Sequence, residues 1–324
     1  MAVRSQASPA RMTETHREAM WGYSFTSIWV IGFLVFTAVP IAIAVWISFT
    51  SWSPVAGPFW TAHTIGIKNY QTFLSDHRYW HSIFNTLYYS FGSVLLVNVV
   101  AIPMAMILNQ KLRGINLYRT IFYLPAVMPA VATVLIFRFM FLPGQGLTSW
   151  LLTKLGLQCD PTSVSCSPID WYNDPKVTML VVILISAWAV GQPLLIYLAG
   201  LQGVDTSYYE AASIDGANGW QKFRSITLPL ITPAIFFNIV TGLISAFQEF
   251  AKPVVFAGGS FATPGGPQDS LLTTFWYAYA EGFKYNAMGL ATAMAFGLFV
   301  LILIVTALNF WGQRRWVFYQ EERQ

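Results

Sequence analysis

The sequence has 324 residues, of which 55% are hydrophobic and only 10% are charged. Length alone would indicate about two soluble domains, but this composition excludes an ordinary soluble protein and favours a membrane protein. The formal net charge of +4 does not indicate nucleic-acid binding, because the basic residues are distributed over several loops and form no single basic face.

Six apolar segments recur along the chain. Each can supply the roughly 20 residues that a helix needs to cross about 30 Å of hydrocarbon. We therefore predict an all-α, polytopic membrane protein with six transmembrane helices and no appended soluble domain. A transmembrane domain of residues 24–312 is flanked by tails of residues 1–23 and 313–324. The predicted spans are residues 24–50, 82–108, 119–142, 177–201, 227–257 and 287–311.

The loop charges predict the orientation of these spans. With the N-terminus in the cytoplasm, 11 of the 18 Lys and Arg residues lie inside, and the opposite orientation would place only seven there. The positive-inside rule favours the first arrangement, so both termini and the polar loop of residues 203–226 are expected to be cytoplasmic. The eleven residues are Arg4, Arg11, Arg17, Lys111, Arg113, Arg119, Lys222, Arg224, Arg314, Arg315 and Arg323.

The first and third spans contain prolines. The first apolar segment is too long for a signal-peptide core and has no obvious cleavage site, so we expect an uncleaved span in which Pro40 introduces a kink. In the third span, Pro125 and Pro129 lie four residues apart on one face. They predict a broken or wide-pitched helix, a feature that often lines a pathway. Arg138 is expected to snorkel to the headgroups at the outer end of this span.

Two external connections follow the third and fifth spans. The first, residues 143–175, holds both cysteines of the chain, Cys159 and Cys166. Outside the cytoplasm these residues could form a disulfide or remain two unpaired thiols, and the neighbourhood offers too few further ligands for a metal site. The second connection, residues 260–285, is predicted to form a turn and a short helix resting on the membrane surface.

The cytoplasmic loop between the fourth and fifth spans has clear helix signals. Residues Ser207–Glu210 match the Ser-x-x-Glu capping box, which predicts that a short helix starts there. The Asp-Gly pair at 215–216 and the Asn-Gly pair at 218–219 tolerate positive φ and should end or bend that helix. A second short helix is expected from Trp220 to Ile226. Both segments are too polar to lie in hydrocarbon.

The spacing of residues in this loop resembles a family signature. It consists of Glu210-Ala211-Ala212, three residues, Gly216, nine residues, Ile226, one residue and Leu228-Pro229. This pattern is similar, at every defining position, to the EAA loop of binding-protein-dependent ABC importer permeases. Weaker motifs at residues 66–70 and 265–267 resemble the carbohydrate-uptake branch, of the maltose and glycerol-phosphate type.

The resemblance implies one permease subunit of an ATP-driven importer for a sugar, a di- or oligosaccharide, in a bacterial cytoplasmic (inner) membrane. It implies a heterodimer with a second permease subunit, two copies of a cytoplasmic ATPase that bind ATP and Mg, and an extracytoplasmic sugar-binding protein. The sequence has no G-x-x-x-x-G-K-[ST] phosphate loop, so neither a cofactor nor enzyme activity is expected in this chain. The implied ATPase-coupling residues are Ser207, Glu210, Ala211, Ala212, Asp215, Gly216, Ile226, Leu228 and Pro229.

Polar residues on the fourth and fifth spans are candidates for substrate contact. Thr241, Ser245 and Gln248 are spaced four and three residues apart, so they share one helical face. The resemblance implies that sugar-contacting side chains occur at these positions and at Trp188 and Gln192, where Trp188 could stack on a sugar ring. The alternative is that such small polar groups only hold helices together.

Charged residues near the spans are too few to favour other classes of protein. Glu249 is a functional candidate because it is an acid near a span, although Lys252 three residues later offers an internal ion pair as the alternative. An ion- or proton-coupled secondary transporter, the competing hypothesis, usually needs more buried ionisable groups. A membrane enzyme or a metal site would need a cluster of histidines and acidic residues. The histidines of this chain are not paired with acids at the spacing of such a cluster: His16, His63, His77 and His81.

Overall fold

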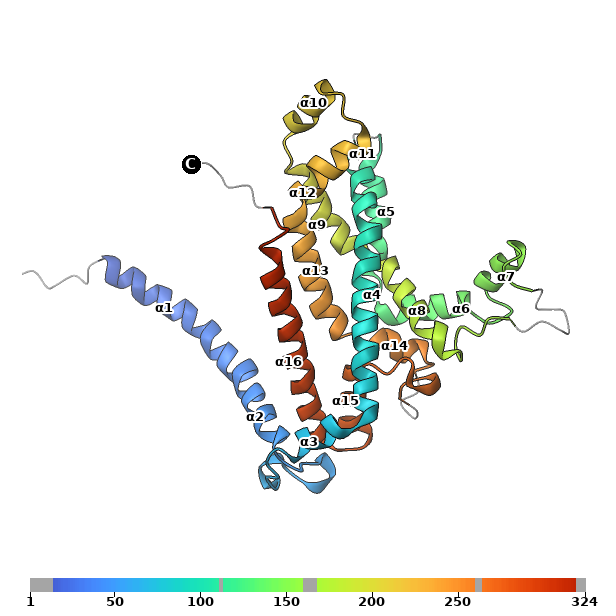
Figure 1. The fold of residues 1–324 in the computed structure, drawn as a ribbon. Coiled ribbons are helices and arrows are strands. Elements are labelled where there is room, and N and C mark those ends of the chain that lie inside the picture. Colours follow the sequence, from blue (N-terminus) through green and yellow to red (C-terminus); the bar gives the residue numbers. More distant parts are fainter. Residues whose placement is uncertain (1–13, 111–112, 160–167, 260–263, 319–324) are drawn as a thin grey trace, which may run out of the picture.

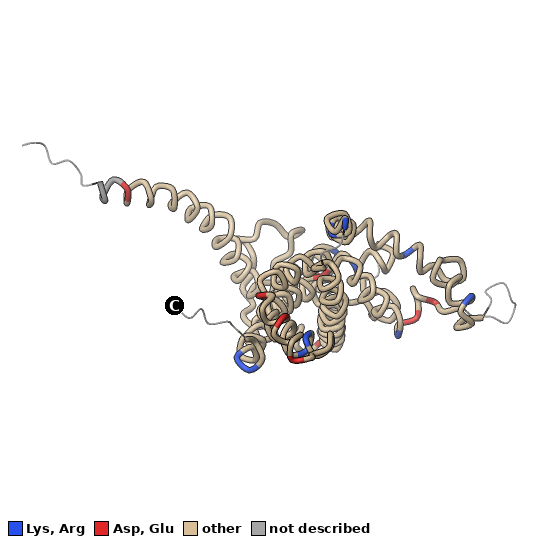
Figure 2. The backbone as a smooth tube through the Cα atoms, turned by 90° about the horizontal axis from the view of Figure 1, so that it is seen from above, with Lys and Arg blue, Asp and Glu red and all other residues tan. Residues whose placement is uncertain are grey.

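The computed structural model describes residues 14–110, 113–159, 168–259 and 264–318. Within these ranges the chain is helical, and the only β interaction is an isolated bridge between Thr50 and Thr64. The predicted all-α fold is therefore confirmed. Charged residues occupy few positions along the described backbone (Figure 2). Cys166, Lys111 and the tail residues Arg4, Arg11 and Arg323 lie outside the described ranges.

Long apolar helices run side by side through the molecule (Figure 1). Residues Glu18–Ser48, α4 (His77–Leu108) and α16 (Met288–Gln313) are each long and apolar enough to cross a membrane. Three further helix pairs pass the same test when each bent pair is taken as one unit, which gives up to six spans among the described residues. Each predicted span corresponds to one of these units, and the count of six stays a prediction.

The first helix begins earlier than predicted, and it contacts the other helices through its last part, which packs against α16. It comprises α1 (Glu14–Phe33), a π-helical segment (Leu34–Ala38) and α2 (Val39–Ser48), and it leans away from the other helices (Figure 1). None of its most apolar window is buried. The π-helical segment precedes Pro40, which has no amide hydrogen to donate to the preceding turn. The irregularity expected at this proline therefore takes the form of a π-helical turn.

The predicted break in the third span is confirmed. The helices α5 (Ile115–Val127) and α6 (Ala130–Met140) meet at an angle of 96°. Met128 between them is extended, with φ −71° and ψ 140°. The cause is steric, because the residue that precedes a proline, here Pro129, is disfavoured in the helical region.

The fourth span bends by 48° between α8 (Pro175–Ser186) and α9 (Gly191–Gln202), across the 3₁₀ turn η4 (Ala187–Ala189). Gly191 allows α9 to pack closely against α5, because a Cβ at this position would lie 2.8 Å from the Ala126 Cβ on α5. A larger residue would push α5 and α9 apart. The fourth span, predicted as one segment of residues 177–201, is therefore bent.

The fifth span is shorter than predicted. The segment Gly219–Leu230 meets α13 (Thr232–Phe247) at 63°. The helix then ends at Phe247, not at residue 257, and a separate short helix α14 (Ala251–Phe256) follows. Pro253 explains the interruption, since it cannot donate to the carbonyl of residue 249.

Helix α4 is the centre of the packing. It contacts α8, α9, α13 and α15. In its second half Ala101 and Ala105 are fully buried, in a cluster that includes Tyr197 and Ile231. Such small side chains let helix backbones approach closely in a membrane protein. A second cluster surrounds Tyr89 and Trp276 near the first half of α4.

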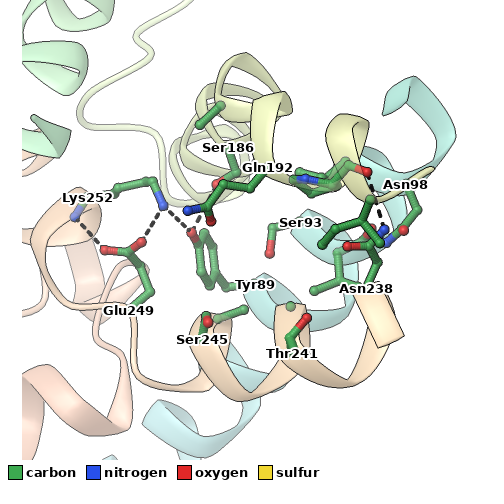
Figure 3. A pocket seen from close by; sticks show the side chains of 17 residues that line it. Tyr89, Ser93, Asn98, Ser186, Gln192, Asn238, Thr241, Ser245, Glu249 and Lys252 are labelled. Carbon is green, nitrogen blue, oxygen red and sulfur yellow. Dashed lines mark hydrogen bonds and ion pairs between the residues drawn. The ribbon is translucent and has the colours of Figure 1, made fainter. Parts of the chain in front are cut away.

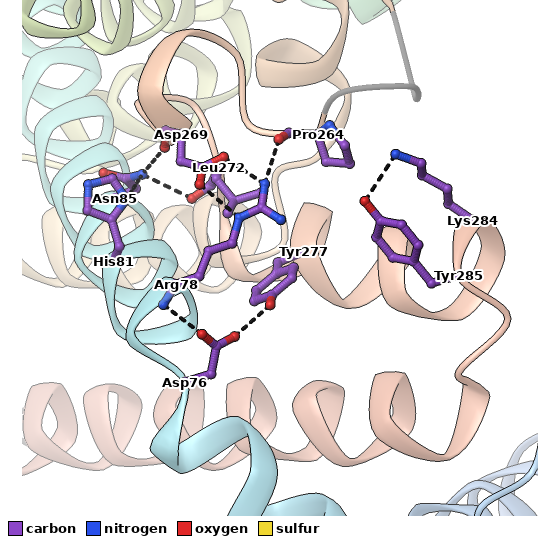
Figure 4. Close-up of polar contacts among 10 residues, drawn as sticks. All are labelled: Asp76, Arg78, His81, Asn85, Pro264, Asp269, Leu272, Tyr277, Lys284 and Tyr285. Carbon is purple, nitrogen blue, oxygen red and sulfur yellow. Dashed lines mark hydrogen bonds and ion pairs between the residues drawn. The ribbon is translucent and has the colours of Figure 1, made fainter.

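A polar network fixes the connection between α14 and α16 to the start of α4 (Figure 4). The Arg78 guanidinium donates to both carboxylate oxygens of Asp269, at 2.8 and 2.7 Å, and to the Pro264 carbonyl oxygen at 2.9 Å. The Asn85 amide donates to the carbonyl oxygens of Asp269 and Leu272, at 2.8 and 3.1 Å. The two-point pairing of Arg78 with Asp269 holds the loop in one orientation.

The short helix after this loop is buried in the protein, which corrects its predicted place on the membrane surface. It is α15 (Thr274–Tyr279), and Trp276 within it is 0% exposed. The Tyr277 hydroxyl donates to an Asp76 carboxylate oxygen at 2.6 Å, and burial, reinforced by this bond, raises the pKa of Tyr277. The helix packs against α4 and α16, where its aromatic residues Trp276 and Tyr277 are buried.

The remaining predictions concern Arg138, the cysteines and the pair of Glu249 and Lys252. The Arg138 guanidinium lies over the Tyr172 ring, 5.3 Å from its centroid, so it has a cation–π partner within the protein. Cys159 is disulfide-bonded. Its predicted pairing with Cys166 stays a prediction, because Cys166 falls outside the described residues. Glu249 and Lys252 form the expected ion pair.

Candidate functional site

The loop that is predicted to be cytoplasmic contains α10 (Thr206–Ile214), which Figure 1 shows beyond one end of the bundle. Its N-cap is Asp205, whose side chain accepts a hydrogen bond from the Ser207 backbone N–H at 2.9 Å. The prediction that Ser207 caps the helix together with Glu210 is therefore wrong. The bond to Ser207 lowers the pKa of Asp205.

The end of α10 follows the predicted glycine turn. Gly216 has φ +77°, the left-handed conformation that favours glycine. The Gly216 N–H bonds to the Ser213 carbonyl oxygen at 3.2 Å, and the Ala217 N–H bonds to that of Ala212 at 2.9 Å. This pair of bonds is a Schellman motif, which satisfies the last carbonyls of a helix.

The chain then returns through α11 (Gly219–Lys222), the π-helical segment η5 (Phe223–Thr227) and α12 (Leu228–Leu230). A capping box does form here, between Asn218 and Gln221. Two side-chain bonds connect α10 to the returning segment. The Tyr209 hydroxyl lies 2.9 Å from the Thr227 Oγ1, and the Lys222 ammonium donates to the Ser213 Oγ at 2.7 Å. We call residues 205–227 the α10 hairpin.

The α10 hairpin exposes large apolar side chains. Ile214 is 87% exposed and Trp220 is 66% exposed. Exposed apolar groups of this size at a polar loop are typical of a protein interaction surface. Five members of the predicted coupling set are also exposed: Ser207, Glu210, Ala211, Asp215 and Gly216. The other members are half-buried along the hairpin and α12: Ala212, Ile226, Leu228 and Pro229.

A second candidate site is a cavity of about 290 Å³ between α4, α9 and α13 (Figure 3). Ligand pockets are commonly about 300–1,000 Å³, so this cavity lies at the small end of that range. Its wall is rich in uncharged polar side chains, together with the single ion pair of Glu249 and Lys252. The labelled polar lining residues are Tyr89, Ser93, Asn98, Ser186, Gln192, Asn238, Thr241, Ser245, Glu249 and Lys252.

Three of the five predicted substrate residues line this cavity: Gln192, Thr241 and Ser245. Gln248 follows the end of α13 and lines a separate, apolar pocket between α13, α15 and α16. The Trp188 ring packs edge-on against Phe137, with centroids 5.6 Å apart, and does not belong to the cavity lining. The structure therefore brings together the polar face of α13 and Gln192 but separates the other two residues from them.

Helix α4 contributes lining residues that the sequence did not indicate. The Tyr89 hydroxyl lies 2.9 Å from the Ser186 Oγ and accepts from the Lys252 ammonium at 3.4 Å. Further along, the Tyr197 hydroxyl donates to the Asn98 side-chain oxygen. The only signal in the sequence was the presence of polar residues within an otherwise apolar span.

The bent spans, the polar cavity among them and the exposed hairpin define a membrane transport subunit. Residues 97–317 match the family described as "Binding-protein-dependent transport system inner membrane component". The chain belongs to this family, whose members form the transport component and not an enzyme. Membership also favours the importer over the secondary transporter, and it implies a binding-protein partner.

Relatives with established names agree with this assignment. The chain is 37% identical to the probable ABC transporter permease protein YesP of Bacillus subtilis (strain 168), with 95% of each chain covered. It is 32% identical to the arabinooligosaccharides transport system permease protein AraP of the same organism, over 89% of this chain and 86% of AraP.

A solved structure has the same fold. A chain of a bacterial alginate ABC transporter, in complex with an alginate pentasaccharide-bound periplasmic protein, superposes with a TM-score of 0.76. The match covers 94% of this chain and 98% of the other, at 22% sequence identity.

Proposed function

We propose that the chain is one permease subunit of an ATP-driven importer for a sugar, a di- or oligosaccharide that an extracytoplasmic binding protein delivers. The proposed subunit crosses a bacterial cytoplasmic membrane six times, with both termini in the cytoplasm. It pairs with a second permease subunit, and two copies of a cytoplasmic ATPase drive the assembly. The names of relatives that carry sugars support the substrate class, and the charge distribution of the loops supports the orientation.

The continuity between hairpin and cavity carries this proposal. Helix α9 ends at Gln202 and α13 begins at Thr232, so the α10 hairpin and α12 connect two helices of the cavity wall directly. An ATPase that moves α10 would therefore move the helices that carry Gln192 and Ser245. A lining rich in hydroxyl and amide groups suits a ligand rich in hydroxyls, since each such group both donates and accepts hydrogen bonds.

A reconstituted importer tests the proposal. The chain is co-expressed with the permease and ATPase encoded beside it, purified, and placed in vesicles with the binding protein and labelled di- and oligosaccharides. Uptake should require ATP, and the ATPase should co-purify with the chain. Glu210→Lys should reduce the ATPase recovered, because it reverses an exposed charge on α10, whereas Glu18→Lys, on the separate first helix, serves as the matched control. Uptake by this chain alone, without ATP, would contradict the proposal.

A further inference from the structure

The short helix α7 (Leu147–Lys154) exposes an apolar face. It lies in the connection between the third and fourth spans, and Figure 1 shows it at the side of the bundle. Four large apolar side chains of this helix and the residue after it are 48–62% exposed: Leu147, Trp150, Leu151 and Leu155. Their spacing of i, i+3, i+4 and i+8 places them on one side of the helix. We call these four residues the α7 face.

The polar side chains of α7 point the other way and fix its orientation. Ser149 is 0% exposed, and its hydroxyl oxygen accepts from the Gly144 N–H at 3.1 Å. The Thr148 hydroxyl donates to the Met140 carbonyl oxygen, at the end of α6, at 2.8 Å. A Cβ at Gly146 would clash with that same oxygen, so the turn between α6 and α7 is closely packed. The helix cannot turn its apolar side toward α6 without losing these bonds.

Water is a poor surrounding for the α7 face. Single exposed apolar side chains are ordinary on a protein, but a group of them on one face points to an apolar partner. The chain does bury such residues elsewhere, since Trp276 on α15 is 0% exposed whereas Trp150 is 58% exposed. The following residues 160–167 read Asp-Pro-Thr-Ser-Val-Ser-Cys-Ser, a mostly polar composition that does not suit this face. The cover must therefore come from outside the chain.

Lys154 indicates that this cover is lipid and not another protein. It is exposed and follows Trp150 and Leu151 by four and three residues, so it lies on the same side of α7. It forms no ion pair with the described residues. A protein partner would bury its ammonium group and would have to supply an acid. At a bilayer surface, the apolar stem lies along hydrocarbon while the ammonium reaches the headgroups, and Trp is enriched at the same boundary.

We propose that α7 lies in the headgroup region of the bilayer, with the α7 face toward the acyl chains and the Lys154 ammonium at lipid phosphate groups. In the predicted orientation this is the outer surface of the membrane. The contact anchors the connection between α6 and α8, both of which belong to bent spans. The inference goes beyond the proposed function, because a lipid contact of α7 neither requires nor excludes any substrate.

Spin-label accessibility tests the inference. The whole importer, with Trp150→Cys or Leu155→Cys, is labelled and placed in vesicles of phosphatidylethanolamine and phosphatidylglycerol. Oxygen concentrates among acyl chains and a nickel chelate stays in water, so collisions with the two reagents distinguish lipid from water. Both labels should meet oxygen more often, and nickel severalfold less often, than a label at Gln71→Cys, an exposed polar position on α3 (Lys68–Ser75). The unsubstituted chain gives the background, since Cys159 is disulfide-bonded.

A charge reversal tests the headgroup contact. Lys154→Glu places a carboxylate against lipid phosphates, so nickel collisions of the label at position 150 should rise severalfold. Lys154→Arg is the matched control, because it keeps the positive charge and should leave these collisions unchanged. If Lys154→Glu cannot be purified, Lys154→Gln removes the charge and should give a smaller rise. The Tm of each variant shows that the importer is still folded.

Three outcomes would overturn the inference. Frequent nickel collisions at positions 150 and 155 would place the α7 face in water. Few collisions with either reagent would place it against a protein, such as a second permease subunit. Nickel collisions that do not change in Lys154→Glu or Lys154→Gln would remove the phosphate contact. None of these measurements involves sugar or ATP, so their failure would leave the proposed function untouched.

Discussion

In the α10 hairpin the hydrogen-bonded side chains are close in sequence, whereas in the cavity they are far apart. Tyr209 and Thr227 are separated by 18 positions. Tyr89, by contrast, bonds to Ser186 at a separation of 97 and to Lys252 at a separation of 163. The hairpin can therefore keep its shape while it moves as one body, but the cavity depends on how α4, α9 and α13 are placed. A perturbation that changes helix packing should damage the cavity and spare the hairpin.

Gly191→Val should give the largest effect and should separate the two regions. A Cβ at this position would lie 2.8 Å from the Ala126 Cβ and 3.1 Å from the Tyr123 Cα, so α5 and α9 must move apart. Overpacking of this kind costs about 1–3 kcal/mol of folding free energy. We expect sugar uptake to be lost while the assembled chain still recovers the ATPase.

Gly203→Ala is the matched control, because its new methyl group would have the Gly200 carbonyl oxygen as its nearest contact, at an ordinary 3.5 Å. This variant should transport normally. Equal loss of uptake and of ATPase recovery in Gly191→Val would show that the hairpin also depends on the packing of α9, and the distinction between the two regions would fail.

Gly216→Val should give the converse result. The residue has φ +77° and open space around its Cβ position, so the change introduces backbone strain without a clash. Left-handed backbone costs an L-residue about 1–2 kcal/mol, and more for a β-branched one. ATPase recovery should fall severalfold, while the Tm shift produced by bound sugar should be retained. Gly219→Val, also in open space but without positive φ, should bind the ATPase normally; loss of sugar binding in Gly216→Val would contradict the comparison.

The sequence predicted features that depend on neighbouring residues. The break before Pro129 and the left-handed Gly216 both follow from local backbone chemistry, and both are present. The N-cap of α10 was misassigned because Asp205 and Ser207 are both good acceptors two positions apart, and the register of the first turn selects Asp205.

The cavity was predicted only in part, because its members come from helices far apart in sequence. Gln248 was assigned to the face of Thr241 on the assumption that the helix continues. The helix ends at Phe247, so the helical spacing no longer applies to Gln248. The turn η4 changes the register around Trp188 in the same way. Tyr89 could not be found, since the side of α4 that faces the cavity is decided by tertiary packing.

Tyr209→Phe should give a smaller effect that sharpens the role of the hairpin. It removes the hydroxyl that lies 2.9 Å from the Thr227 Oγ1. Thr227 is only 4% exposed. A net hydrogen bond contributes about 0.5–1.5 kcal/mol, so the hairpin should still form but should transmit motion less faithfully. We expect a higher ratio of ATP hydrolysed to sugar taken up. Tyr208→Phe, at an exposed neighbouring position, is the control; the same ratio in both variants would exclude the Tyr209 contact from coupling.

Asp205→Ala should give the smallest effect, confined to the start of α10. It removes the acceptor for the Ser207 N–H, and hydrogen exchange of the first-turn amides should become severalfold faster, with ATPase recovery nearly unchanged. Because the hydrogen bond lowers the pKa of Asp205, its stabilising effect is complete above the unfolded-state value of about 3.9 and is lost as pH falls through the lower folded-state pKa. Asp205→Asn keeps an acceptor without the titrating group, so its protection should be independent of pH across this window. Wild-type protection that persists below the window would show that the carboxylate is not the cap.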